Sequence, residues 1–307
     1  MPDGDTIRGA RILLAGGTGS FGRAFLPQLL ALGPARVVVF SRDEAKHAAL
    51  REEFPGTICE IGDVRDFERV REVLRRQSPD VVLMLAALKR VDDCESHPAE
   101  AVQTNVVGAL NVLRAAADFR IPRLVAVSTD KAVEPINTMG MTKAIQERLV
   151  RAYGYNVARY GNVIGSRGSV IPLFHAQAKA GRPLRVTDPE MTRFWLPYRR
   201  AGALLLHALE HAMDGSVFVP ILPACKMGDL AEAMATHGWN AAGVRSGEKL
   251  HESLIAESEC ATVEVRIGAV RIHGNCSERI EKLTSDRAER LDVPAIKKML
   301  AEAGWAA

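Results

Sequence analysis

The sequence predicts an α/β protein with a doubly wound parallel sheet, of the Rossmann type, and a smaller C-terminal lobe. Short apolar runs alternate with helical patterns through the first half of the chain, which is the rhythm of a parallel sheet covered by helices. Two of the runs, VVVF and VVLML, are continuously apolar, as in strands buried on both faces. A glycine-rich turn separates the first apolar run from the first helical pattern, which is typical of nucleotide-binding sheets.

Strands and helices are expected to alternate in order along this half. The expected strands are Arg11–Ala15, Arg36–Phe40, Thr57–Ile61, Asp80–Leu85, Arg123–Ser128 and Tyr155–Tyr160. The expected helices lie near residues 20–32, 43–53, 66–77, 99–118 and 138–153. In the fourth helix, apolar residues recur at three- and four-residue steps from Val102 to Ala117, so we expect that face to be buried.

Beyond residue 165 this alternation ends. Glycine and proline are frequent through 165–197, a helix (201–213) and a strand (Ser216–Val219) follow, and the tail is mixed. We expect residues 1–164, with 198–220 returning to them, to form the dinucleotide-binding Rossmann domain. Residues 165–197 and 221–307 are expected to form the substrate-binding lobe.

Composition and charge exclude several classes of protein. The 307 residues are 47% hydrophobic and 25% charged, which is too apolar for disorder as the main state. The 40 basic and 37 acidic residues leave a net charge of +3 without a basic block, so no nucleic acid partner is expected. The longest apolar run, Val81–Leu88, has eight residues. A bilayer span needs about 20, so no membrane insertion is expected.

The expected compartment is the cytoplasm. The N-terminal segment carries acidic residues where a signal peptide needs a basic region followed by a longer apolar stretch. Five cysteines form an odd set with no close pair, which fits neither a disulfide framework nor a zinc site. His207 and His211 lie four residues apart but lack the glutamate spacing and third ligand of a zinc site, so no metal is expected.

The first strand is followed by GGTGSFG, residues 16–22, whose glycines have GxxGxxG spacing. Glycine permits a tight turn and the close approach of a pyrophosphate, which then faces the positive end of the helix. We therefore expect a dinucleotide here, and a glycine turn without a ligand is the alternative. The candidate binding residues are Gly16, Thr18, Gly19, Ser20, Phe21 and Gly22.

The end of the second strand selects the cofactor. A carboxylate there suits the free 2′-hydroxyl of NAD, whereas arginine accommodates the 2′-phosphate of NADP. Ser41, Arg42 and Lys46 favour NADP, and Asp43 is the one feature that would suit NAD. The alternative is that both cations are simply solvated. Asp63, which ends the third strand in GDVRD, is expected to touch the adenine.

The fifth strand ends in an adjacent acid and base. Thr129, Asp130 and Lys131 lie at the carboxyl end of this strand, where ligands of open α/β sheets bind. The next helix carries Met139 and Lys143 four residues apart, hence on one face. These five residues are the candidate catalytic group. The alternative is a structural pair in which the acid and base bond to each other or to the backbone.

At this point the chain resembles the extended short-chain dehydrogenase/reductases, whose signature is a Tyr-x-x-x-Lys pair. Within them it is similar to the capsule-type UDP-N-acetylglucosamine 4,6-dehydratases (5-inverting, or 5-epimerases) of polysaccharide biosynthesis. The resemblance extends from residue 16 to about 254, and the tail TSDRAERLDV also fits. The matching segments are GGTGSFG, FSRDEAK, IGDVRD, AALKRV, STDKAVEPINTMGMTK, RYGNVIGSRGSVIPLF, VTDPEMTRF and RSGEKLHESL.

Position 139 departs from the wider class, because methionine replaces the tyrosine of the signature. A thioether cannot take up a proton, so the resemblance leaves open which group accepts the proton of the sugar C4 hydroxyl. The capsule-type branch is similar in having methionine here, which supports the assignment. The direct role expected of Met139 is flexible packing.

The resemblance implies a lyase that acts on UDP-N-acetylglucosamine without net redox change. Hydride would leave sugar C4 for NADP⁺ and return to C6 after water is lost, with C5 inverted if its proton arrives on the opposite face. Lys131 would remove the C5 proton, and Asp130 would protonate the departing C6 hydroxyl. This role needs the pKa of Lys131 below the ordinary ~10.4, and burial or a cation such as Lys143 is expected to lower it.

The resemblance also implies binding roles. Lys143 corresponds to the ribose-binding lysine of the class, and Asn105 to the residue that steadies this helix and the cofactor. Val64, Ala86 and Ala87 lie in matching segments and are cofactor candidates. Each candidate for the nucleotide end of the substrate could instead be a surface charge. These candidates are Lys89 (also a cofactor candidate), Asn162, Arg193, Arg245 and Glu248.

Two other functions stay open. A nucleotide-sugar 4-epimerase shares the fold and cofactor, but it needs only C4 chemistry and would normally keep the tyrosine. A sensor that binds NADP without turnover would not need the acid–base pair. Because the relatives implied by the resemblance are oligomeric, a homo-oligomer (a dimer or larger) is expected.

Overall fold

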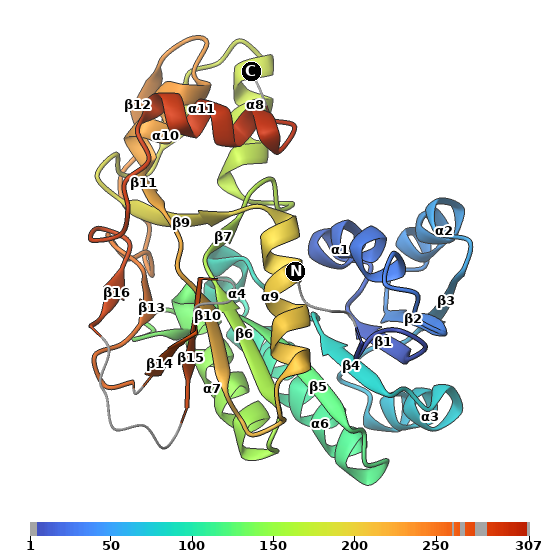
Figure 1. Ribbon diagram of the computed structural model, residues 1–307. Helices are drawn as coiled ribbons and strands as arrows, with labels where there is room; N and C mark the ends of the chain where they lie inside the picture. The colour runs from blue at the N-terminus through green and yellow to red at the C-terminus, as the bar shows by residue number, and fades with distance from the viewer. Residues whose placement is uncertain (1–4, 260, 265–267, 274–280, 306–307) are drawn as a thin grey trace.

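A nine-stranded sheet forms the centre of the protein (Figure 1). The computed structural model describes residues 5–259, 261–264, 268–273 and 281–305. The order across the sheet is β14-β15-β10-β6-β5-β4-β1-β2-β3. These strands are β1 (Arg11–Ala15), β2 (Arg36–Ser41), β3 (Thr57–Ile61), β4 (Val81–Met84), β5 (Arg123–Thr129), β6 (Asn156–Tyr160), β10 (Val217–Pro220), β14 (Ala261–Glu264) and β15 (Ala269–Ile272).

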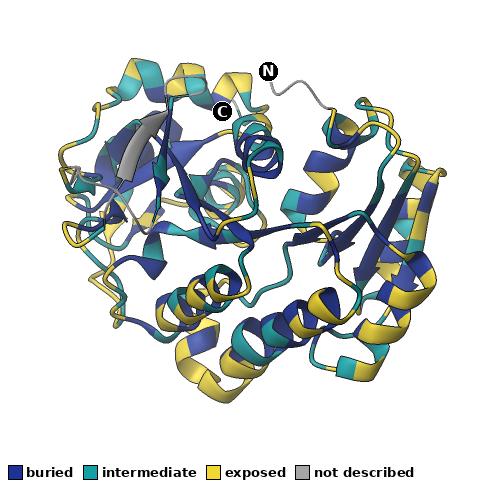
Figure 2. Ribbon diagram, turned by 60° about the horizontal axis from the view of Figure 1, so that its bottom comes forward, coloured by how far each residue is buried: buried dark blue, intermediate teal, exposed yellow. Residues whose placement is uncertain are grey.

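The strands from β3 to β10 all run parallel, which confirms the predicted doubly wound sheet. The order reverses direction between β1 and β4, the switch point at which such sheets bind nucleotides. Each predicted strand agrees with an observed one to within one residue at either end. The apolar runs define the inner strands well because these strands are buried on both faces (Figure 2), whereas the edge strand β3 has exposed residues such as Ile61.

Helices cover both faces of this sheet (Figure 1). One face carries α1, which packs against α9, and the other carries α3, α6 and α7, packed in that order. These helices, together with α2, have the bounds α1 (Ser20–Leu30), α2 (Glu44–Glu53), α3 (Phe67–Gln77), α6 (Gly108–Asp118), α7 (Thr138–Ala152) and α9 (Tyr198–Glu210).

The helix predicted at 99–118 is not a single α-helix. It consists of α5 (Pro98–Val102), a π-helical turn (Gln103–Val107) and α6. The predicted buried face is only partly correct, because Leu113 is buried but Val102 is exposed, and short side chains such as Ala116 are buried instead. Since α6 packs against both α3 and α7, short side chains suit this close contact.

The smaller lobe has its own apolar core, at the top of Figure 1. Phe174, Trp195 and Ile296 are buried at its centre. The lobe contains β7 (Asn162–Val163), α8 (Val170–Lys179), β8 (Leu184–Val186), β9 (Thr192–Leu196), β11 (Ala224–Lys226), α10 (Met227–Met234), β12 (Trp239–Ala241), β13 (Ser253–Ile255), β16 (Leu283–Thr284) and α11 (Val293–Glu302).

The C-terminal chain contributes to both parts. Residues 198–220 form α9 and β10 against the large sheet. However, β14 and β15 fall within 221–307, which the sequence assigns to the lobe, and they extend the large sheet as antiparallel strands. The assignment of the two parts to cofactor and substrate stays a prediction.

Two further expectations concern thiols and membranes. Cys59, Cys94 and Cys225 are free thiols, and Cys260 and Cys276 lie outside the described residues. Among the described residues, no helix combines the length and the apolar character that a membrane crossing requires.

Candidate active site

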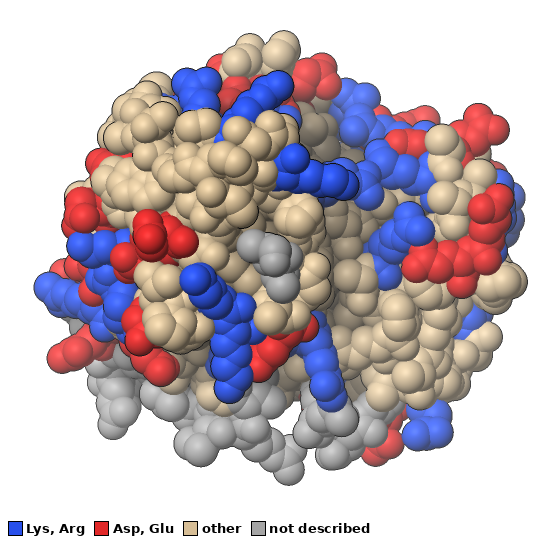
Figure 3. All heavy atoms as spheres, turned by 90° about the horizontal axis from the view of Figure 1, so that it is seen from above, with Lys and Arg blue, Asp and Glu red and all other residues tan. Residues whose placement is uncertain are grey.

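A cavity of about 900 Å³ lies where the large sheet meets the smaller lobe. Figure 3 shows the molecule hollowed between these two parts, with Lys and Arg side chains on both sides of the hollow. Its walls come from the start of α1, the segment after β4, the ends of β5 and β6, α7, and several lobe segments. The cavity therefore lies at the carboxyl edge of the sheet, where the sequence places the acid–base pair.

The glycine turn before α1 has the form of a phosphate cradle. Gly16 has a φ of +88°, and a Cβ there would lie 2.5 Å from the backbone nitrogen of Ala86. A Cβ on Gly17 would lie 2.9 Å from Val39 Cγ1, so both glycines are required by packing. A Cβ on Gly19 would meet only the Gly16 oxygen, at 3.2 Å. Because Gly19 caps α1 without a side-chain bond, the first N–H groups of the helix suit a bound phosphate.

The end of β2 presents hydroxyl and cationic groups beside this turn. The Ser41 hydroxyl lies 2.8 Å from Thr18 Oγ1 and 2.9 Å from His47 Nε2. The Asp43 carboxylate caps α2 by accepting from the backbone N–H of Lys46, and it also pairs with the Lys46 amine. The one carboxylate that would suit NAD is therefore already engaged by its own helix.

Asp63 and Arg42 form the adenosine side of the candidate cofactor site. Arg42 donates to Asp63 Oδ2 at 3.4 Å, and Arg65 Nε donates to the same oxygen at 2.8 Å. The Arg42 side chain is half exposed.

The helix α7 is tied to the segment after β4 by Asn105. This side chain is fully buried in the π-helical turn, and its Oδ1 accepts from Leu88 N at 2.8 Å. Its Nδ2 donates to the Leu88 carbonyl at 2.9 Å and to Thr142 Oγ1 at 3.0 Å. Asn105 thus connects α7 to the cavity wall, and its role toward a cofactor stays a prediction.

Lys143 projects from α7 into the cavity wall. Its amine donates to the Val127 carbonyl at 2.6 Å and to Gln146 Oε1. Burial lowers the pKa of the Lys143 amine to about 8, against the opposing effect of the Glu147 carboxylate. Met139, one turn earlier on the same helix, also lines the cavity and packs against Cys94 and Ala101.

Asp130 and Lys131 form a buried ion pair at the end of β5. Lys131 Nζ lies 3.0 Å from Asp130 Oδ1, which also accepts from the Thr129 hydroxyl at 2.9 Å. Asp130 is fully buried, and its Oδ2 has no hydrogen-bond partner among the described residues. Burial raises the pKa of Asp130, against the opposing effect of the Lys131 ammonium.

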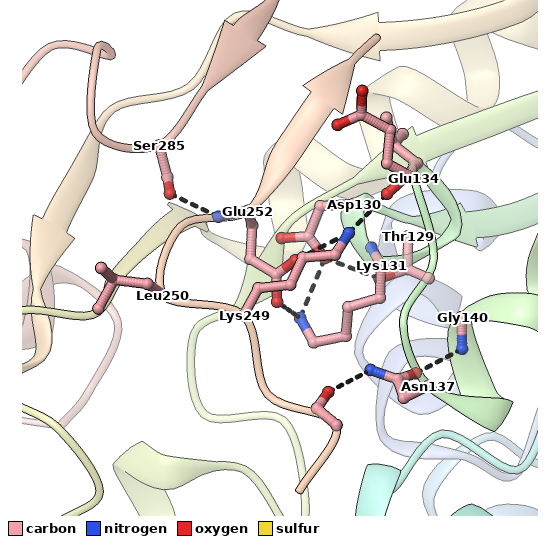
Figure 4. A network of polar contacts seen from close by, with 12 residues as sticks. Thr129, Asp130, Lys131, Glu134, Asn137, Gly140, Lys249, Leu250, Glu252 and Ser285 are labelled. Carbon is pink, nitrogen blue, oxygen red and sulfur yellow. Dashed lines mark hydrogen bonds and ion pairs between the residues drawn. The ribbon is translucent and has the colours of Figure 1, made fainter. Parts of the chain in front are cut away.

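A third charged group, Glu252, also contacts the Lys131 amine of this pair. Its Oε1 lies 3.3 Å from Lys131 Nζ, and the amine points between the carboxylates of Asp130 and Glu252 (Figure 4). Burial alone would lower the pKa of Lys131, but the carboxylates of Asp130 and Glu252 outweigh it and raise that pKa. The expected lowering of the Lys131 pKa by burial or by Lys143 is therefore wrong for this arrangement.

The candidates for the nucleotide end of the substrate all line the cavity. Lys89 Nζ donates to Ser166 Oγ at 2.7 Å, and Asn162 Oδ1 lies 3.4 Å from Lys131 Nζ. Arg193 is buried, and its terminal nitrogens donate to backbone carbonyls, including that of Lys249 at 2.9 Å. Its guanidinium therefore anchors a loop. The other cavity-lining candidates are Arg245 and Glu248.

The remaining candidates fall into two groups around the cavity. Those that also line it are Phe21, Ala87, Thr129, Lys131, Met139 and Lys143. Those that lie outside its walls are Gly16, Thr18, Gly19, Ser20, Gly22, Ser41, Arg42, Lys46, Asp63, Val64, Ala86, Asn105 and Asp130.

Sequence reasoning missed Glu252, although it lies in the matching segment RSGEKLHESL. It also missed Tyr160 and Tyr198, which line the cavity, and the short helix α4 (Val91–Ser96) beside it. The signal available for Glu252 was a carboxylate followed by the apolar run SLI, a pattern too common to mark a site.

The parallel sheet, the glycine turn at its switch point and the α7 helix define the class of protein. They give a Rossmann-type α/β fold that matches the epimerase and dehydratase structures of the short-chain dehydrogenase/reductase type. The polysaccharide biosynthesis protein family matches residues 12–272, and the chain belongs to that family.

Similar proteins differ in the activities that their names state. The UDP-glucose 4-epimerase of Rickettsia massiliae is 38% identical to this chain over 94% of both. The X-ray structure of Pen from Bacillus thuringiensis superposes with a TM-score of 0.90 and 32% identity, covering 97% of this chain and 99% of that one. The dTDP-glucose 4,6-dehydratase DesIV of Streptomyces venezuelae, solved with NAD and TYD bound, shares the fold with a TM-score of 0.71. It is 24% identical to this chain, and the match covers 78% of this chain and 86% of that one.

Proposed function

We propose that this protein is an NADP-dependent nucleotide-sugar 4,6-dehydratase that acts on UDP-N-acetylglucosamine and inverts C5. The observation that carries the proposal is the buried Asp130–Lys131 pair, whose lysine lines the cavity, because elimination of water requires an acid and a base at one place. Met139 supports it, since a methionine in the tyrosine position resembles the capsule-type dehydratases.

The residues of the cavity edge fit a nicotinamide dinucleotide. The uncapped N-terminus of α1 suits its pyrophosphate, and the Lys143 amine suits a ribose hydroxyl. Arg42 suits a 2′-phosphate, because Asp43 is engaged as a helix cap. When bound, such a cofactor supplies the hydride acceptor for sugar C4.

The acid–base pair can prepare itself by one internal proton transfer. Lys131 holds a proton at neutral pH, and burial favours the protonated form of Asp130. The two groups are close enough for proton transfer, because Lys131 Nζ lies 3.0 Å from Asp130 Oδ1. Passing the proton from Nζ to Oδ1 leaves a neutral amine and a protonated carboxyl. The amine then takes the proton from C5 of the 4-keto sugar, and the carboxyl gives its proton to the departing C6 oxygen. The pair returns to its initial charges as water leaves.

Mass spectrometry of the reaction with UDP-N-acetylglucosamine tests this proposal. We expect a product lighter by one water, with no net consumption of cofactor. Proton NMR of the product reports the configuration at C5. Loss of water without inversion at C5 would correct only that part of the proposal. Absence of turnover with this substrate would overturn the proposal as stated and favour a sensor that binds NADP without turnover.

A 4-epimerase is the second candidate, because relatives 38% identical carry that name. The same mass measurement separates the two, since an epimer has the mass of the substrate. The expected homo-oligomer stays a prediction that light scattering in solution would test.

Replacing Arg42 with alanine is expected to weaken binding of NADP about tenfold or more and to leave binding of NAD nearly unchanged. The reason is that a charged hydrogen bond to phosphate is worth about 1.5–3 kcal/mol, and only NADP carries the 2′-phosphate. Titration of each cofactor by calorimetry measures the effect, with Arg75→Ala on the exposed surface of α3 as the control. An equal loss for both cofactors would contradict this role for Arg42.

A further inference from the structure

We propose that Glu252 is a positioning residue of the acid–base pair, which holds the Lys131 amine in the cavity and sets the protonation of both Lys131 and Asp130. This inference rests on the proposed function and assigns a role to a carboxylate in the smaller lobe. It makes the catalytic group a composite of the sheet edge and the lobe.

The first argument is geometric. The Lys131 amine lies between two carboxylates, 3.0 Å from Asp130 Oδ1 and 3.3 Å from Glu252 Oε1 (Figure 4). The Glu252 side chain is only 3% exposed, and it forms part of the cavity wall. An ammonium on a flexible four-carbon stem is fixed in position by contacts from two sides. Without Glu252 the amine would keep only Asp130 and the longer contact with Asn162 Oδ1 at 3.4 Å.

The second argument is that the lobe itself holds Glu252 in place. The backbone N–H of Glu252 donates to Ser285 Oγ at 2.9 Å, and that hydroxyl donates to the Thr192 carbonyl at 3.1 Å. Arg193 donates to the carbonyls of Lys249 and Leu250 and so fastens the preceding turn to β9. These buried contacts give Glu252 a defined position before any substrate binds.

The third argument is the charge balance around the amine. The charged groups facing Lys131 are Asp130, Glu252, Lys249 and the more distant Arg193, whose Nε lies 3.9 Å from Glu252 Oε1. Glu252 in turn faces Lys249, at 3.9 Å from Oε2, and the Lys249 amine also donates to the Val133 carbonyl. Glu252 therefore supplies the second negative charge that Lys131 meets inside the protein.

Removing the negative charge of Glu252 is expected to lower the pKa values of Asp130 and Lys131. A nearby carboxylate favours the protonated form of a neighbour and so raises its pKa, as Glu252 does for both Asp130 and Lys131. Since the pair titrates with two macroscopic pKa values, loss of the Glu252 charge lowers both. An acid–base pair is expected to give a bell-shaped pH profile of activity, and both of its limbs then move to lower pH.

The first experiment compares pH profiles of kcat for the holoenzyme and three variants. In Glu252→Gln we expect both limbs to move by about one to three pH units to lower pH, and kcat to fall about tenfold to a hundredfold with KM nearly unchanged. Glu252→Asp keeps the charge, so its limbs stay in place while kcat falls. Glu257→Gln removes an exposed carboxylate from the same segment and should match the parent protein. Unmoved limbs in folded Glu252→Gln would overturn the proposal.

The second experiment does not depend on turnover. NMR of the isotope-labelled methylene beside the Lys131 amine, identified by its loss in Lys131→Met, reports the titration of that amine directly. We expect a lower pKa in Glu252→Gln than in the parent protein and in Glu257→Gln. The same pKa in all three would refute the role of Glu252 even if the protein proves to be a dehydratase. A shift without dehydration would refute only the proposed function.

Discussion

Replacing Lys131 with arginine is expected to lower dehydratase turnover by about 10²–10⁴-fold, the usual contribution of a general base. Arginine keeps a cation between Asp130 and Glu252, but its guanidinium does not give up a proton near neutral pH. The variant therefore separates the base function of Lys131 from its structural charge. Incorporation of solvent deuterium at sugar C5, followed by mass spectrometry, measures the loss.

The alanine variant at the same position tests both functions together. Lys131→Ala leaves two buried carboxylates without their cation, and breaking a buried pair in this way costs about 3–5 kcal/mol of stability. We expect it to lose C5 exchange and to unfold at a lower temperature, whereas Lys131→Arg unfolds near the parent temperature. Lys179→Ala, at an exposed position on α8, is the control. Exchange retained in Lys131→Arg would remove Lys131 as the base.

Replacing Asp130 with asparagine should stop the loss of water while leaving sugar oxidation in place. The amide cannot protonate the departing C6 oxygen, but it keeps nearly the volume of the carboxyl in this fully buried position. We expect about 10²–10⁴-fold less dehydrated product, as for loss of a general acid. Treatment with borodeuteride would then place deuterium at C4 of a sugar that still carries its C6 oxygen.

The matched control for this variant is Asp118→Asn, which removes an exposed carboxylate at the end of α6. Normal dehydrated product from Asp130→Asn would end the acid role of that residue. Failure to oxidise C4 at all would instead show that Asp130 also takes part in the first step, through its hydrogen bond with Thr129.

The sheet was predictable from sequence because its strands are encoded locally. VVVF and VVLML are unbroken apolar runs, each preceded by a charged residue (Arg36 and Asp80), so the predicted bounds match β2 and β4 closely. The glycine turn and the Asp130–Lys131 pair are also local, since their members are neighbours in the chain. Their place at the sheet edge follows from parallel topology.

Features that depend on tertiary contacts were not predictable in this way. Glu252 reaches Lys131 only because Ser285 and Arg193 fix the path of its segment, and no periodicity encodes such contacts. For the same reason, the charge of Arg193 suggested from sequence that it binds a phosphate. In the structure its terminal nitrogens instead donate to backbone carbonyls. The pairing of β15 with β10 is likewise a contact between distant segments.

The route of the C-terminal chain through both parts has a consequence for biosynthesis. The strands that frame the glycine turn leave the ribosome before β6, whereas Glu252, β14 and β15 emerge only after α9, β10 and α10. A nascent polypeptide that has reached β6 already contains the glycine turn and both members of the acid–base pair. Glu252, the carboxylate that we propose to position Lys131, has not yet been synthesised at that point. A nascent chain that stops before Glu252 is therefore expected to lack the second contact that we propose for the Lys131 amine.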